Sequence, residues 1–278
     1  MSLIRPLLRR GFHRWRALGR RVFHLARPDY RSLETEGNSL YLAERRAVAG
    51  LLYARTRGKV FAGPFSQMRV PLNAYFESCP PFIVGSHEEE LHPQFYALVN
   101  ATPSRIVNIG AAEGYYAVGL AHLLPDCPVL AYETIPECQQ VIRDLAEQND
   151  VADRLELAGT CDAASLQGSL TRNSLLLIDC EGAEAELLDP EKVPALRTTR
   201  MICELHDFYV PGLTRTLIRR FRASHHLTLI EKQARQADRY GVLDGLTPTQ
   251  KFFALHENRY VGTERTHARY MVLTPHNT

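Results

Sequence analysis

The sequence predicts an α/β fold built on a doubly wound, mostly parallel seven-stranded sheet. Short apolar runs suited to buried strands alternate with helical patterns of about ten to fifteen residues, which is typical of βαβ units. A turn of small residues follows one of these strands and opens a helix, and an acidic residue closes the next strand. Together these observations indicate an α/β domain of the nucleotide-binding class.

The composition fits a globular chain. The 278 residues are 45% hydrophobic, which is enough for a core and for one or two domains. Charged residues make up 23%, which excludes disorder throughout. The net charge of +2 is too balanced for a general nucleic-acid binder, so we expect no nucleic acid as a partner. We expect one main domain over residues 58–278, preceded by an N-terminal extension over residues 1–57.

Residues 1–28 carry eight arginines and no acid. Their apolar residues recur every three or four positions, which predicts a basic amphipathic helix. These residues are Ile4, Leu8, Phe12, Trp15, Leu18, Val22 and Leu25. Such a helix suits peripheral contact with an anionic membrane surface. The interpretation that we favour is that its apolar face docks on the domain or on a second subunit of a homodimer.

The six cysteines form no Cys-x-x-Cys pair, which argues against a disulfide framework or a zinc site. No stretch reaches 18 consecutive apolar residues, so we expect no transmembrane helix. The N-terminus lacks an uninterrupted apolar segment with a small-residue cleavage site, so it does not resemble a signal peptide. A cytoplasmic location is the resulting expectation.

The elements follow in order along the chain. Residues 58–72 predict two short strands around a Gly-Pro turn, which add a hairpin to the helical extension. The buried strands are predicted at 105–109, 129–133, 155–158, 175–179, 201–205, 227–230 and 269–274. Thr134 and Glu137 have capping-box spacing at the start of one helix. Thr247 and Gln250 start another, and His225 and His226 are expected at a sheet edge.

The strongest signal for chemistry is the turn at residues 107–116, which reads VNIGAAEGYY. Gly110 and Gly114 allow the backbone to approach a ligand closely, and exposed N–H groups at a helix start suit a polar ligand. Glu133 lies nineteen residues beyond Gly114, where an acid can accept hydrogen bonds from both ribose hydroxyls of a nucleoside. The pattern therefore predicts a nucleoside site.

Two residues of the turn favour one nucleoside over another. Ala112 replaces the glycine that lies next to the pyrophosphate in the dinucleotide fingerprint. Glu113 adds a negative charge that would repel a pyrophosphate and attract a cationic sulfonium or amino group. The turn therefore favours S-adenosylmethionine as the cofactor and disfavours NAD.

The turn resembles motif I of class I S-adenosylmethionine-dependent methyltransferases, and Glu133 matches their ribose-binding acid. Residues 178–184, which read IDCEGAE, resemble the IDVEGAE signature of FkbM-type methyltransferases, and so do residues 203–207, CELHD. The DCEGAE piece is the more discriminating one. The resemblance implies a Rossmann-like class I methyltransferase domain.

The resemblance extends over about residues 60–275 and includes segments 63–65 and 85–91 ahead of the core. Two positions depart from the pattern of the family. Asn108 stands where many class I enzymes have an aspartate, and His87 stands where relatives often have a tyrosine.

The resemblance implies roles for individual residues. Gly110, Ala111, Glu113 and Gly114 would hold the methionine end of the cofactor, and Glu133 its ribose. Asp162 would lie beside the adenine, or it caps a helix, or it does both.

Several polar residues end the fourth and fifth strands, at the carboxyl edge where open α/β sheets bind ligands. Asp179 is expected to contact the cofactor, and Glu181 and His206 to take part in catalysis. His206 is the candidate general base, because a histidine pKa near neutrality suits proton removal from a hydroxyl. We predict no metal; the alternative is that Asp179, Glu181, Glu204 and His206 bind Mg²⁺ or another hard cation.

The sequence thus predicts an S-adenosylmethionine-dependent methyltransferase that methylates oxygen on a small-molecule, sugar or lipid-linked acceptor. Two alternatives remain. One is a catalytically silent nucleotide-binding or membrane-associated protein on the same fold. The other is an NAD-dependent oxidoreductase.

Overall fold

The computed structural model of the chain describes residues 36–257 and 269–276. The basic helix predicted over residues 1–28 lies outside the described residues. The chain divides into two compact units, residues 1–43 and 44–278, so the division falls inside helix α2 (Glu36–Thr56). Arg45, Val48 and Leu52 of α2 are buried and belong to the second unit.

The second unit is built on a seven-stranded sheet with the strand order β3-β2-β1-β4-β5-β7-β6. Its strands are β1 (Arg105–Ile109), β2 (Val129–Tyr132), β3 (Leu155–Ala158), β4 (Ser174–Ile178), β5 (Arg200–Glu204), β6 (His225–Glu231) and β7 (Arg269–Pro275). Strands β1 to β5 pair in parallel, and β7 runs antiparallel to both β5 and β6. The predicted mostly parallel seven-stranded sheet is confirmed.

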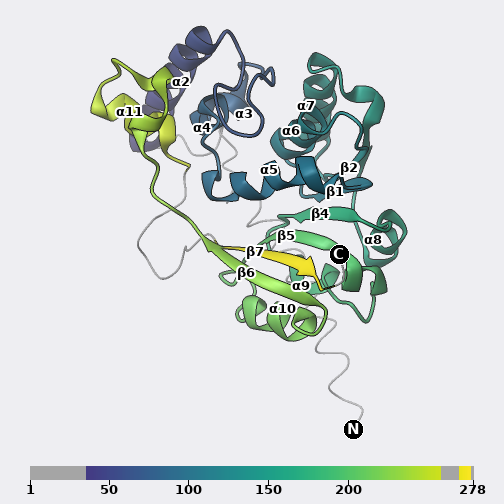
Figure 1. Cartoon of the computed structure of the whole chain (residues 1–278). Coiled ribbons are helices and arrows are strands. Elements are labelled where there is room, and N and C mark those ends of the chain that lie inside the picture. Colours follow the sequence, from purple (N-terminus) through teal and green to yellow (C-terminus); the bar gives the residue numbers. More distant parts are fainter. Residues whose placement is uncertain (1–35, 258–268, 277–278) are drawn as a thin grey trace. The chain divides into compact units, whose positions relative to one another are not determined.

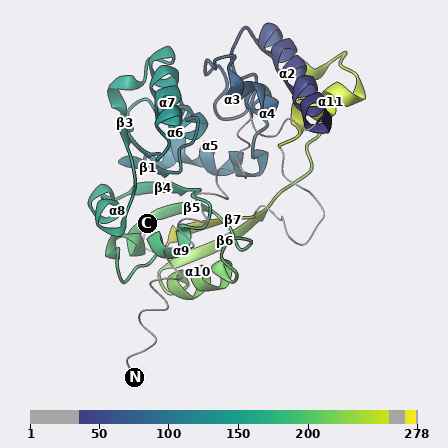
Figure 2. The same cartoon turned by 180° about the vertical axis from the view of Figure 1, so that it is seen from behind.

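Helices cover both faces of this sheet (Figure 1). Those on one face are α5 (His92–Ala101), α6 (Tyr115–Leu123) and α7 (Pro136–Gln148). On the other face lie α9 (Glu184–Leu187) and α10 (Leu213–Phe221), and Figure 2 shows the same arrangement from behind. Strands covered on both faces need apolar residues at nearly every position, which explains the short continuous apolar runs of the sequence.

Further helices complete the unit. They are α3 (Ala74–Glu77), α4 (Pro80–Val84), α8 (Ala163–Ser169) and α11 (Pro248–Leu255), with short 3₁₀ turns at Glu89–Leu91, Ala152–Arg154, Pro194–Thr198, Ala237–Arg239 and Gly241–Leu243. Helix α11 packs on α4. Leu166 of α8, Leu187 of α9 and Leu217 of α10 pack against Val107 and Ile178 of the sheet in one buried cluster.

The structure confirms one of the predicted helix starts and corrects the other, and it also corrects the predicted hairpin. The helix predicted to start at Thr247 is confirmed as α11, and the structure adds a capping box between Thr247 and Gln250. The predicted capping by Thr134 is wrong: α7 begins at Pro136 without a side-chain cap, and the Ile135 N–H donates instead to Glu133. The hairpin predicted over 58–72 is reduced to a single antiparallel bridge between Lys59 and Arg69.

None of the six cysteines, all of which lie in the described residues, forms a disulfide. Across the described part of the chain, every helix is too short or too polar to cross a membrane.

Candidate active site

The polar residues singled out in the sequence gather along the carboxyl edge of the parallel strands. Gly110, Glu133 and Asp179 directly follow β1, β2 and β4, and Glu204 is the last residue of β5. The strand order changes direction between β1 and β4. In open α/β sheets this switch point is where ligands bind, so the edge at β1 and β4 is the candidate site.

The turn between β1 and α6 packs its backbone closely against the residue that follows β4. Gly110 has φ +80°, and a Cβ there would lie 1.7 Å from the carbonyl oxygen of Asp179. The sequence argument assigned the space beside Gly110 to a ligand; the structure fills that space with the end of β4. Ala112 and Gly114 also have positive φ, +57° and +87°, so the turn is tight throughout.

A substitution tests this account of Gly110. We expect Gly110→Ala to destabilise the fold by more than about 1–2 kcal/mol, the usual cost of a left-handed backbone for a residue with a Cβ, because the clash with Asp179 adds to it. Gly159→Ala is the matched control, since no described atom lies within 4 Å of its Cβ position. Urea denaturation of both variants measures the difference. Equal stability of the two would mean that the turn has another conformation.

Glu133 is buried at the end of β2, with 3% of its surface exposed. One carboxylate oxygen, Oε2, accepts a hydrogen bond from the Ala112 N–H (2.7 Å), and Oε1 accepts one from the Ile135 N–H (2.9 Å). Each oxygen keeps a lone pair. Glu133 therefore fixes the 110–114 turn to the end of β2 and can still accept hydrogen bonds from a ligand's hydroxyl groups.

Other residues with a predicted cofactor role lie around the same turn and at the end of β3. Ala111 is buried and donates its N–H to the carbonyl of Tyr132, whereas Glu113 is half-buried. Asp162 caps α8, because its Oδ1 accepts hydrogen bonds from both the N–H and the hydroxyl of Ser165. The backbone hydrogen bond from Ser165 also lowers the pKa of Asp162. The capping role is confirmed, and the contact with adenine stays a prediction.

A small pocket opens on one face of the sheet at this edge. It is lined by Glu88, Leu91, Asn108, Gly110, Tyr116, Leu177, Ile178, Asp179, Ile202, Glu204 and Tyr270. The strand register explains the polar residues among them. Asn108 and Ile202 both pair with Leu177, and Asp179 and Glu204 lie two residues beyond Leu177 and Ile202, on the same face.

His206 lies where three carboxylates converge. Its Nε2 is 3.6 Å from Asp179 Oδ1, 3.6 Å from Glu181 Oε2 and 3.7 Å from Glu204 Oε2. Its Nδ1 is 2.8 Å from Oε1 of Glu184, which is fully buried. The structure therefore brings together Asp179, Glu181, Glu204 and His206, the four residues of the metal-binding alternative, and adds Glu184 behind the imidazole.

The surroundings change the proton affinities of this cluster. Burial opposes the charged form of His206, but the hydrogen bond with Glu184 and the nearby carboxylates outweigh it and raise the pKa to about 10. Burial of Oδ1 and the charge of Glu181 raise the pKa of Asp179 to about 6, although His206 opposes the shift. An imidazole that is protonated at neutral pH differs from the neutral ring expected of a general base.

Sequence reasoning missed Glu88, which lies in the loop before α5. Glu88 is buried with φ +48°, and its carboxylate accepts a hydrogen bond from the Tyr116 hydroxyl. Non-glycine residues that hold a left-handed backbone conformation are often found at functional sites. The signal in the sequence was the run of three acids at residues 88–90, directly before the apolar Leu91.

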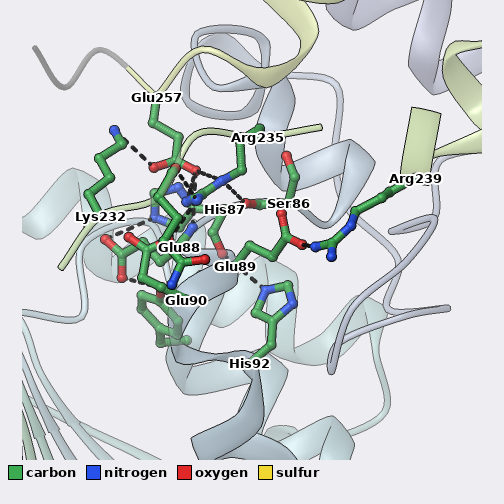
Figure 3. Close-up of polar contacts among 12 residues, drawn as sticks. Ser86, His87, Glu88, Glu89, Glu90, His92, Lys232, Arg235, Arg239 and Glu257 are labelled. Atoms are coloured by element: carbon green, nitrogen blue, oxygen red, sulfur yellow. Dashed lines mark hydrogen bonds and ion pairs between the residues drawn. The ribbon is translucent and has the colours of Figure 1, made fainter. Parts of the chain in front are cut away.

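An ion-pair network holds the loop that carries Glu88 (Figure 3). Arg235 lies between two buried acids, 2.6 Å from Glu90 and 2.6 Å from Glu257. Arg235 also donates to the carbonyl of Ser86, and Glu257 accepts the N–H of Glu88. The segment after β6 thus fixes the backbone on both sides of His87, which positions Glu88 at the pocket.

No family model and no curated protein matches the chain. Solved structures with a related arrangement include an O-methyltransferase from Bacillus cereus in complex with SAH, with 15% identity over 65% of this chain and 78% of that chain and a TM-score of 0.44. TomG, an O-methyltransferase from Streptomyces achromogenes involved in tomaymycin synthesis and solved with SAM, has 16% identity over 66% and 80%, with a TM-score of 0.42. A precorrin-6y C5,15-methyltransferase from Geobacter metallireducens has 12% identity over 67% and 89%, also at 0.42. At these identities and TM-scores, the likeness assigns no activity or ligand to this chain.

Proposed function

We propose that this chain is an S-adenosylmethionine-dependent methyltransferase that acts on an oxygen acceptor. The observation that carries the proposal is the position of Glu133. Its buried carboxylate is held by two backbone N–H groups at the end of β2, directly beside the glycine turn after β1. A carboxylate fixed at this place in an α/β sheet is suited to the two hydroxyls of a ribose.

The residues present fit this cofactor better than a dinucleotide. The turn carries Glu113 and has Ala112 in place of a second glycine, so no pyrophosphate cradle is formed. When bound, S-adenosylmethionine supplies a methyl group activated by its sulfonium.

The chain would align the acceptor and receive its proton. Glu88, Asp179 and Glu204 place carboxylates around one pocket, and Tyr116 adds a hydroxyl. Carboxylates near a substrate hydroxyl can hold it in line with the methyl group and accept the proton as the new C–O bond forms. The acceptor that we propose is a small molecule, a sugar or a lipid-linked compound.

The finer assignment to the FkbM type is also part of the proposal. It is supported by the DCEGAE segment, whose last glutamate is Glu184. The Glu184 carboxylate accepts hydrogen bonds from the N–H groups of Cys180 and Gly182. This residue therefore stabilises the conformation of the loop after β4. We further propose a reducing compartment such as the cytoplasm, because none of the six cysteines, all within the described residues, forms a disulfide.

Substitution of Glu133 tests the cofactor site. We expect Glu133→Gln to weaken binding of S-adenosylhomocysteine by roughly ten- to a hundred-fold, because charge-assisted hydrogen bonds to the ribose contribute about 1.5–3 kcal/mol. Calorimetric titration measures the dissociation constant. Glu137→Gln, four residues further on and exposed, is the control and should bind as the wild type does. An unchanged dissociation constant for Glu133→Gln would remove Glu133 from the site.

The activity itself is tested with labelled S-adenosylmethionine and an extract of the source cells. Addition of the purified wild-type protein should label a new extractable compound, and the Glu133→Gln variant should label much less of it. Absence of transfer, together with binding of the labelled compound, would support the catalytically silent alternative.

A further inference from the structure

We propose that Asp179, Glu181, Glu204 and His206 bind a divalent cation of the Mn²⁺ kind at the carboxyl edge of β4 and β5. A single nitrogen, Nε2 of His206, lies 3.6–3.7 Å from one oxygen of each carboxylate. These separations exceed hydrogen-bond length. They match the roughly 3.0–3.8 Å between neighbouring ligand atoms that bind one ion at about 2.1–2.3 Å.

The ligand atoms of three of these residues already lie near one another. One ligand atom from each of Asp179, Glu181 and His206 lies within 4.8 Å of the other two. The Glu181 backbone is held in the left-handed region, at φ +56°, next to Gly182 at φ +105°. A non-glycine backbone persists in such a conformation only where its surroundings hold it, so the backbone of this loop is fixed.

The other side of the imidazole is built to orient Nε2. Nδ1 of His206 contacts Oε1 of Glu184 at 2.8 Å. Glu184 is fully buried and accepts the N–H groups of Cys180 (2.9 Å) and Gly182 (2.8 Å). Histidines that bind metals donate their second ring N–H to a carboxylate or carbonyl in this way, which fixes both the ring orientation and the tautomer.

Asn108 gives an independent indication of a ligand. It is 2% exposed, and its Oδ1 is buried without a hydrogen-bond partner among the described residues. It lines the same pocket as Asp179 and Glu204. A buried amide oxygen left without a donor costs about 1–3 kcal/mol. Water bound to a cation would supply that donor.

The ligand set selects the kind of ion. Three carboxylates favour ions that prefer oxygen, such as Mg²⁺, Ca²⁺ and Mn²⁺, whereas an imidazole favours transition-metal ions. Mn²⁺ satisfies both preferences, and its binding would displace the proton that His206 carries on Nε2 at neutral pH. With the proposed function, an ion here would bind the acceptor oxygen and lower the pKa of its hydroxyl. That role rests on the proposed function, whereas binding of the ion does not.

The test therefore measures binding of Mn²⁺ alone. The purified full chain is treated with chelator, dialysed and titrated with MnCl₂, and free Mn²⁺ is followed by its electron paramagnetic resonance signal. We expect one ion per chain. We expect Glu181→Gln and Glu184→Gln to weaken binding at least tenfold, about the effect of losing a ligand or its supporting carboxylate.

The controls separate the possible outcomes. Glu186→Gln, an exposed acid two residues beyond Glu184, should bind Mn²⁺ as the wild type does. Glu181 is 32% exposed, so its substitution keeps the test valid even where Glu184→Gln fails to fold. Absence of stoichiometric Mn²⁺ binding, or equal affinity of Glu181→Gln and the wild type, would overturn the proposal. Loss of S-adenosylhomocysteine binding in an Asp179→Asn variant, with no Mn²⁺ binding by the wild type, would assign the acids to the cofactor's amino group instead.

Discussion

Replacement of Arg235 by methionine is expected to destabilise the fold by about 3–5 kcal/mol, the usual cost of removing one partner from a buried ion pair. The Arg235 side chain is 6% exposed, and those of Glu90 and Glu257 are 0% and 1% exposed. Burial raises the pKa of Glu90, and Arg235 is the main group that opposes this shift. Without the guanidinium, Lys232, which is 3.2 Å from Glu257, remains as the nearby cation.

The matched control is Arg239→Met. Arg239 pairs with Glu89 at 2.7 Å but is 61% exposed, so its loss is expected to cost no more than about 1 kcal/mol. Figure 3 shows both arginines with their acidic partners. Urea denaturation of both variants gives the comparison. We also expect Arg235→Met to loosen the loop that places Glu88 at the pocket, so the variant should lose activity even at temperatures where it stays folded. Similar stability of the two variants would show that the buried network contributes little.

His206→Ala is expected to reduce methyl transfer by about ten- to a hundred-fold, the usual effect of losing a residue that positions the groups of a site. Nε2 of His206 is the atom toward which Asp179, Glu181 and Glu204 converge, and its loss leaves these carboxylates to repel one another. The affinity for S-adenosylhomocysteine should change little, because Glu133 and the 110–114 turn do not contact the imidazole in the hydrogen bonds and ion pairs described above. Single-turnover transfer and calorimetric titration measure the two effects separately.

A control variant and a stability measurement accompany the His206→Ala experiment. His226→Ala, on the exposed edge strand β6, should keep the wild-type rate. Thermal denaturation of His206→Ala shows whether the buried Glu184 carboxylate, which keeps its two backbone donors, still supports the fold. A near-normal rate in a folded His206→Ala protein would contradict a role for this histidine in the reaction.

The sequence was sufficient to predict the sheet, because strands buried on both faces leave continuous apolar runs. Strand β3 matches its predicted range, and β1 does as well. The carboxyl-edge cluster followed from the same logic, since residues at the ends of neighbouring parallel strands must meet. Asp179 and His206 were therefore found together without knowledge of any side-chain geometry.

What could not be predicted depends on contacts distant in sequence. Glu88 reaches the pocket through Arg235 and Glu257, which lie about 150 and 170 residues away, and no local pattern encodes that pairing. The sequence correctly indicated that residue 110 must be a glycine, but for a different reason. A side chain there would clash with the carbonyl of Asp179 rather than with a ligand. The pKa of His206 depends on Glu184, whose burial the sequence does not reveal.

The most direct test of the central claim is calorimetric titration of the purified wild-type chain with S-adenosylhomocysteine and, separately, with NAD⁺. The account predicts that S-adenosylhomocysteine binds with one site per chain and that NAD⁺ gives no measurable heat of binding. The reason is that Ala112 replaces a glycine of the dinucleotide fingerprint and the charge of Glu113 would repel a pyrophosphate. Binding of NAD⁺ in place of S-adenosylhomocysteine, or binding of neither, would contradict the assignment of this site to a methyl donor.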